Sequence, residues 1–151
     1  MTDVHSPETR SRNMAAIRAA NTRPELLLRR ALFAQGFRYK LHDKRLPGQP
    51  DLVFPKYRAL VFVHGCFFHG HECAAFRWPS TRQEFWRSKI EGNRARDGRT
   101  VGRLQDAGWR VMTVWECALR GRHRLQLSQV ITRISAWLQS NEPQGEISGR
   151  D

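Results

Sequence analysis

One acidic residue stands where it could hold a metal ion. Asp51 directly follows a turn and begins a predicted strand, and the next predicted strand ends at Val63-His64. Adjacent strands can place Asp51 beside the end of the second strand, where the backbone carbonyl of Val63 offers another oxygen. Magnesium prefers oxygen ligands and keeps several of its waters. Asp51 taken alone is better interpreted as a turn acid.

Two histidines favour a catalytic interpretation of this region. His64 and His69 flank the end of the same predicted strand. Metal-aided hydrolysis of a phosphodiester needs an activated water, a general base with a near-neutral pKa, and stabilisation of the departing oxygen. Histidine suits the second task. Glu25 and Asp97 could orient a histidine or a water, but the sequence alone leaves them as ordinary acids on helix surfaces.

A second group of metal-ligating residue types lies close by. Cys66, His71 and Cys73 have the spacing Cys-x4-His-x-Cys, and Cys117 follows a later predicted strand. Three thiolates and one imidazole form a common closed zinc site, which would tie the loop of residues 64–79 to that strand. The alternative is three buried, unligated cysteines. A closed site has no open position, so we expect this zinc to be structural.

Composition restricts the class of protein. The 151 residues fit one domain, and 40% of them are hydrophobic. Lys and Arg number 26 against 14 Asp and Glu, and the net charge of +12 is spread along the chain, which favours a nucleic-acid partner over a merely solvated basic surface. Three cysteines cannot all pair internally. No stretch is long and apolar enough for a membrane span or a leader, so we expect a cytoplasmic protein.

Periodicity and turn residues predict an α/β domain with a central mixed sheet flanked by helices. We expect one domain over residues 1–138, beginning with a basic helix over residues 1–20, and a disordered tail over residues 139–151. The other predicted helices cover residues 22–36, 81–107 and 125–138, and the predicted strands cover residues 37–41, 51–54, 58–63 and 109–115.

Several motifs in one order resemble those of the very-short-patch repair (Vsr) mismatch endonucleases. The likeness covers about residues 1–138. Several ordered motifs are far more specific than one short pattern. The motifs are Thr9-Arg10-Ser11-Arg12-Asn13-Met14, Leu46-Pro47-Gly48, Pro50-Asp51, the run from Val63-His64-Gly65 to His71-Glu72-Cys73, Thr81-Arg82 with Phe85-Trp86, and Gly108-Trp109-Arg110-Val111 with Trp115-Glu116-Cys117-Ala118-Leu119-Arg120-Gly121.

The resemblance implies a restriction-endonuclease-like fold and a magnesium-dependent nick 5′ to the thymine of a T:G mismatch. Such mismatches arise when 5-methylcytosine deaminates, so it also implies a functional association with a cytosine-5 DNA methyltransferase. We expect a monomer that is bound to the nucleoid when it engages DNA. By resemblance, magnesium lies at Asp51 and the Val63 carbonyl. The implied remaining active-site residues are His64, His69, Glu25 and Asp97, and the implied zinc ligands are Cys66, His71, Cys73 and Cys117.

The resemblance also implies how DNA is contacted. Phe67, Phe68 and Trp86 resemble the family's intercalating aromatics, which would wedge beside the mismatch and stack on bases. The alternative is that they are core residues, a better fit for Trp86 than for two Phe in a polar loop. Met14 would be an apolar tip in the opposite groove. The other expected DNA contacts are Lys89 and Asn93 at the mismatch, and Arg10, Arg12 and Arg18 at phosphates.

Two departures from the family pattern lie in the key loop. Val63 stands where Thr is usual, which is harmless if only its carbonyl binds metal, and Phe68 stands where Trp is expected. Restriction enzymes usually carry a second acid and a Lys where this chain has Phe62 and His64. The remaining alternatives are a nuclease of the same fold with broader specificity, and a zinc-dependent DNA-binding module without activity.

Overall fold

The computed structural model describes residues 22–150. The expected N-terminal helix therefore lies outside the described residues, together with Arg10, Arg12, Met14 and Arg18. None of the helices within residues 22–150 has the length and apolar character needed to cross a membrane.

A five-stranded mixed sheet forms the centre of the molecule, in the order β1-β2-β3-β4-β5. The first three strands are antiparallel neighbours, whereas β3, β4 and β5 run parallel. This arrangement confirms the predicted α/β class with one mixed sheet. The strands are β1 (Lys40–Leu41), β2 (Leu52–Phe54), β3 (Ala59–His64), β4 (Arg110–Trp115) and β5 (Gln144–Ile147).

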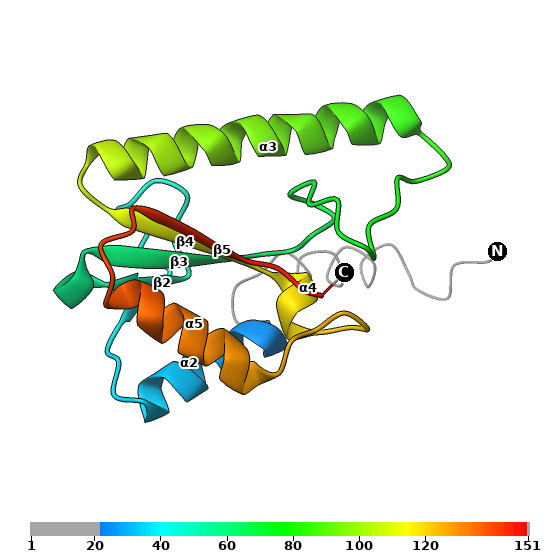
Figure 1. Ribbon diagram of the computed structural model, residues 1–151. Helices are drawn as coiled ribbons and strands as arrows, with labels where there is room; N and C mark the ends of the chain where they lie inside the picture. The colour runs from blue at the N-terminus through cyan, green and yellow to red at the C-terminus, as the bar shows by residue number, and fades with distance from the viewer. Residues whose placement is uncertain (1–21, 151) are drawn as a thin grey trace, which may run out of the picture.

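Helices cover both faces of the sheet (Figure 1). The long α3 (Gln83–Asp106) lies across one face, and α2 (Arg23–Ala34) and α5 (Leu127–Leu138) cover the other. Within residues 22–150, two further short helices are the 3-10 turn η1 (Pro55–Tyr57) and α4 (Glu116–Leu119).

Local sequence explains where α2 begins and ends. The Thr22 side chain accepts a hydrogen bond from the backbone of Glu25, and Pro24 lies in the first turn. Gly36 follows the last turn with φ +98°, a left-handed conformation that glycine adopts at little cost. Glu25 is thereby fixed in the first turn of α2, a position from which its side chain enters the site described below.

Strand β3 is buried on both faces, as expected for a parallel strand in mid-sheet. Ala59 and Val61 belong to the larger core, formed with α2 and α5. Leu60 and Phe62 belong to the smaller core, with Leu104 near the end of α3. Only Leu104 and Ile90 of α3 are buried, so most of this helix is free to line a surface.

The predicted disordered tail is wrong for part of its length. Residues 144–147 form β5, which pairs in parallel with β4, and Ile147 is 1% exposed. Gly145 allows close approach, because a Cβ there would lie 2.8 Å from the Met112 side chain. The glycines and polar residues of this segment suggested disorder. A strand that pairs with the open side of β4 needs only backbone hydrogen bonds and one buried apolar side chain, which Ile147 supplies. The predicted strand over residues 37–41 shortens to Lys40–Leu41.

We expect Ile147→Ala to lower the free energy of unfolding by about 2–5 kcal/mol, because it leaves a cavity in the larger core. Denaturant unfolding would measure the loss. Asn141→Ala, at an exposed position before β5, is the control and should change little. Equal and negligible effects of both substitutions would contradict a packed β5.

Candidate active site, metal cluster and nucleic-acid interface

A cleft of about 1240 Å³ opens at the carboxyl ends of β3 and β4. Ligands of α/β sheets commonly bind at this end of parallel strands. The first turn of α2, the loop after β3, α3 and the α4–α5 loop supply its walls. All five residues expected to be catalytic line it: Glu25, Asp51, His64, His69 and Asp97.

Two acids and a histidine meet on one side of this cleft. Glu25 is only 2% exposed, and its carboxylate lies 3.0 Å from Nε2 of His42. The same Nε2 lies 3.7 Å from Oδ1 of Asp51. The other Asp51 oxygen accepts a hydrogen bond of 2.7 Å from the backbone N–H of Val63. One ligand atom from each of Glu25, His42 and Asp51 falls within 4.8 Å of the others.

The environment of Asp51 suits a cation. Burial and the neighbouring Glu25 carboxyl together raise the pKa of Asp51 to about 8, although the Val63 N–H opposes this rise. A nearby positive charge favours the ionised form of such a carboxyl. A divalent ion with oxygen ligands therefore fits this pocket. The structure shows that the Val63 N–H donates a hydrogen bond to Asp51. A metal contact through the Val63 carbonyl stays a prediction.

A stacked histidine pair forms the opposite side of the cleft. The rings of His64 and His69 are parallel with centroids 3.8 Å apart. Asp97 of α3 places Oδ2 2.6 Å from Nδ1 of His69. An Nδ1–H that donates to Asp97 leaves Nε2 of His69 as the acceptor nitrogen, the form a general base requires.

Burial, together with the adjacent His69, lowers the pKa of His64 to about 3, although the Asp97 carboxylate opposes this shift. The His64 imidazole is therefore neutral near pH 7. It can accept a hydrogen bond there, but it does not offer a positive charge to a phosphate.

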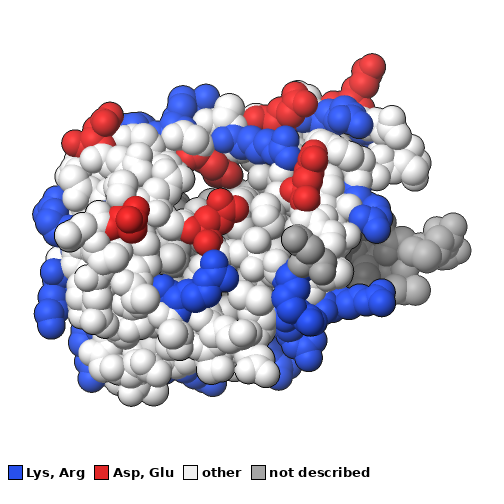
Figure 2. Space-filling model, in the orientation of Figure 1, with Lys and Arg blue, Asp and Glu red and all other residues white. Residues whose placement is uncertain are grey.

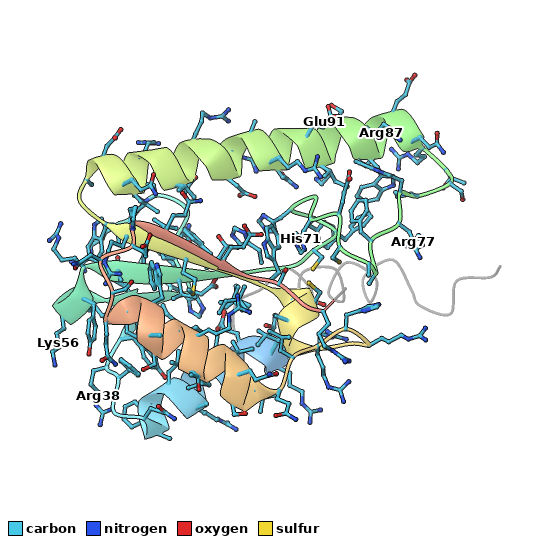
Figure 3. All side chains as sticks on the ribbon, viewed as in Figure 1. Arg38, Lys56, His71, Arg77, Arg87 and Glu91 are labelled. Carbon is cyan, nitrogen blue, oxygen red and sulfur yellow. The ribbon has the colours of Figure 1, made fainter. Side chains whose placement is uncertain are left out.

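The four residues expected to bind zinc come together. Cys66, His71, Cys73 and Cys117 each offer a ligand atom within 4.8 Å of the others, and all three cysteines are free thiols. Burial raises the pKa of Cys66 and of Cys117, so thiolates at this cluster need a compensating cation. Figure 3 shows His71 where the loop after β3 lies close to the sheet. The donor set fits a tetrahedral zinc ion.

Sequence reasoning missed the residues that surround this cluster. Trp115 stacks on His71 with ring centroids 4.2 Å apart. Glu146 of β5 accepts a 2.7 Å hydrogen bond from the Trp115 indole and lies 4.0 Å from Nε2 of His71. The Gly149 N–H donates to Sγ of Cys117. Glu146 and Gly149 lie in the segment that composition had assigned to disorder.

His42 was also missed, although strand register could have found it. Leu41 pairs with Leu52 across β1 and β2, so the residue after Leu41 faces the residue before Leu52. The His42 N–H accordingly donates to the Asp51 carbonyl at 3.2 Å.

The aromatic residues expected to intercalate form one cluster. Phe67 lies 5.2 Å from both Phe68 and Trp86, and 6.1 Å from Phe76, between ring centroids. Phe67, Phe68 and Phe76 line the cleft, whereas Trp86 packs beside them and does not. The Asn93 amide donates to the Phe68 carbonyl at 2.8 Å and so ties this loop to α3.

Basic side chains surround the same opening. In Figure 2, Lys and Arg gather at the lower right, where Figure 1 places the α4–α5 loop. A positively charged cleft concentrates polyanions. The basic residues that line the cleft are Arg23, Arg77, Lys89, Arg96, Arg120 and Arg122.

An acidic pocket, a stacked histidine pair and a basic, aromatic cleft are the features expected of a nuclease that hydrolyses DNA phosphodiesters. The family described as DNA mismatch endonuclease Vsr has a model that matches residues 2–75. The DNA mismatch endonuclease Vsr of Escherichia coli is 48% identical over 138 residues, which cover 91% of this chain and 88% of that protein. The chain therefore belongs to the Vsr family of DNA mismatch endonucleases.

Two nicking enzymes are further relatives. The type II nicking enzyme V.XorIIP of Xanthomonas oryzae is 51% identical over 119 residues, covering 79% of this chain and 88% of that protein. The type II nicking enzyme V.NmeAIP of Neisseria meningitidis is 41% identical over 136 residues, which cover 89% of this chain and 97% of that protein.

We expect His64 to stay neutral between about pH 5 and pH 8, because its pKa lies well below that of an unperturbed histidine. Folding then disfavours proton uptake, so His64 destabilises the folded state as the pH falls below about 6.5. Long-range proton–nitrogen NMR, assigned with His64→Gln, would follow its ring. A titration midpoint near 6.5 would contradict this assignment.

Proposed function

We propose that this protein nicks one strand of duplex DNA 5′ to the thymine of a T:G mismatch, in a defined sequence context, and thereby initiates very short patch repair. The observation that carries the proposal is the convergence of Glu25, Asp51, His64, His69 and Asp97 in one cleft, in a chain 48% identical to a mismatch endonuclease. A restriction-endonuclease-like fold is consistent with the mixed sheet and with acids at its edge.

Asp51, together with the carbonyl of Val63, would hold a magnesium ion. When bound, that ion supplies Lewis-acid stabilisation of charge on the phosphate. His69 removes a proton from the attacking water through Nε2, while Asp97 keeps its Nδ1–H in place. His64 packs flat against His69 and limits the orientations its ring can take.

The aromatic cluster supplies the means to detect a mismatch. A wobble pair costs less to unstack than a matched pair, so residues that wedge into the stack favour it. Phe67 and Phe68 line the cleft as the wedge, and Trp86 supports Phe67 from behind. Lys89 and Asn93 lie on the α3 wall of the cleft and would contact the mismatch. Deamination of 5-methylcytosine produces this substrate, so the enzyme would accompany a cytosine-5 DNA methyltransferase and act as a monomer on the nucleoid.

The nicking proposal is tested on end-labelled duplexes that contain T:G or C:G in several methyltransferase contexts, with magnesium or with EDTA. We expect one magnesium-dependent nick beside the thymine of T:G in one context. Cutting of matched duplex would support a broader nuclease instead. Binding without cutting in every context would overturn the enzymatic proposal in favour of a DNA-binding module.

We expect Asp51→Asn to reduce nicking by at least about 100-fold, the size of loss seen when one charge-stabilising group leaves an active site. Asparagine keeps the size of the side chain, so mismatch binding measured by fluorescence anisotropy should persist. Glu91→Gln removes one charge from an exposed position on α3 and is the matched control. Undiminished nicking by Asp51→Asn would refute the metal assignment.

We propose that the Cys66, His71, Cys73 and Cys117 cluster holds a structural zinc ion. Zinc binding would then stabilise the folded state, because the ion joins the loop after β3 to α4. We expect about one zinc per chain by elemental analysis, and Cys117→Ser should lose both the metal and thermal stability. His123→Gln, outside the cluster, should retain both. A stable, zinc-free and active Cys117→Ser variant would exclude a structural role.

A further inference from the structure

His42 occupies the acidic pocket although no motif points to it. It follows β1 directly, and its backbone N–H bonds the Asp51 carbonyl at 3.2 Å. This backbone bond fixes the start of its side chain beside Asp51. The side chain is 20% exposed and extends inward to the two carboxylates.

One ring nitrogen serves both acids. Nε2 of His42 lies 3.0 Å and 3.2 Å from the two oxygens of Glu25 and 3.7 Å from Oδ1 of Asp51. An imidazole placed only to pair with Glu25 would not need to reach Asp51 as well. One ligand atom from each of the three side chains lies within 4.8 Å of the others, which is close enough for all three to bind one ion. Glu25 also pairs through Oε2 with Nη1 of Arg29 at 3.1 Å.

We propose that His42 is a direct ligand, through Nε2, of the divalent ion held by Asp51 and Glu25. The inference rests on the proposed function, because it takes that ion to lie at Asp51. With His42 and Glu25 added to Asp51 and the Val63 carbonyl, the ligand set is one imidazole nitrogen, two carboxylates and one backbone carbonyl. In an octahedral ion, four protein ligands leave two positions for a phosphate oxygen and water.

This ligand set has a consequence for metal preference. Carboxylates suit magnesium and manganese alike, whereas imidazole binds manganese and cobalt better than magnesium. The site therefore accepts Mn²⁺ or Co²⁺ more tightly, relative to Mg²⁺, than a site made of oxygen ligands alone. Nicking supported by Mn²⁺ at low metal concentration follows from the presence of His42.

The backbone of His42 decides which substitutions test this role. Its φ is +45°, a left-handed conformation that Asn adopts more readily than most residues. His42→Asn therefore preserves the turn but withdraws the ligand, because its side chain is shorter. His42→Gln keeps most of the reach but replaces the nitrogen ligand with an amide. Circular dichroism and thermal melts would show that both variants fold.

The experiment measures Mn²⁺ binding directly on the zinc-loaded full chain. Electron paramagnetic resonance of free Mn²⁺ gives the affinity, competition with Mg²⁺ gives the preference, and pulsed spectra detect nitrogen bonded to the bound ion. We expect the wild type to bind Mn²⁺ with a nitrogen coupling. Both His42 variants should lose that coupling and about 10-fold in Mn²⁺ affinity, with a smaller loss for Mg²⁺. His123→Gln is the matched control and should keep both.

Asp51→Asn separates the two proposals. Loss of the Mn²⁺ site in Asp51→Asn, with affinity and coupling retained in both His42 variants, would overturn the role of His42 and leave the metal assignment intact. Retention of the Mn²⁺ site in Asp51→Asn, or no Mn²⁺ binding by the wild type, would overturn both. If His42 only donates a hydrogen bond to Glu25, the His42 variants should bind Mn²⁺ more weakly, but the wild type should show no nitrogen coupling. That result would also contradict direct ligation.

Discussion

The parallel pairing of β3 with β4 is the contact on which the rest of the site depends. It aligns six residue pairs, from Ala59 with Arg110 to His64 with Trp115. Because both strands run in one direction, their carboxyl ends lie side by side at one end of the sheet. The histidine pair and the Cys-His loop follow β3 there, and Cys117 follows β4. Residues about fifty positions apart form one cluster because two backbones are in register.

The two sides of the cleft differ in the charge state that burial imposes. Burial raises the pKa of Asp51 and lowers that of His64, so each side disfavours its own charged form. The acidic side gains from a cation, and the His64 ring on the histidine side stays neutral near pH 7. Environments that push pKa values apart are a general way to assign separate roles to neighbouring groups. Here the division follows from which strand or helix supplies each side chain.

Sequence patterns predicted those helices, strands and ligand groups that depend only on residues close together in the chain. The apolar run of β3, the Thr22 cap of α2 and the spacing of Cys66, His71 and Cys73 each suffice without knowledge of distant partners. Glu25 shows the limit of such patterns, because a first-turn acid predicts a solvent-exposed helix start and yet it is 2% exposed. His42, Glu146 and Gly149 depend on strand register and on β5. Their roles come from partners far along the chain, which composition and periodicity do not encode.

The position of β5 has a consequence for synthesis in the cell. Its residues pair with β4 and supply the groups around His71 and Cys117, yet they follow every other described strand in sequence. A nascent chain thus leaves the ribosome with an unpaired β4 edge and incompletely shielded thiols until residues 144–150 emerge. Open strand edges invite association with other chains. Translation speed over the codons for residues 144–150, and metal supply during that interval, should therefore affect how much of the protein reaches its folded state.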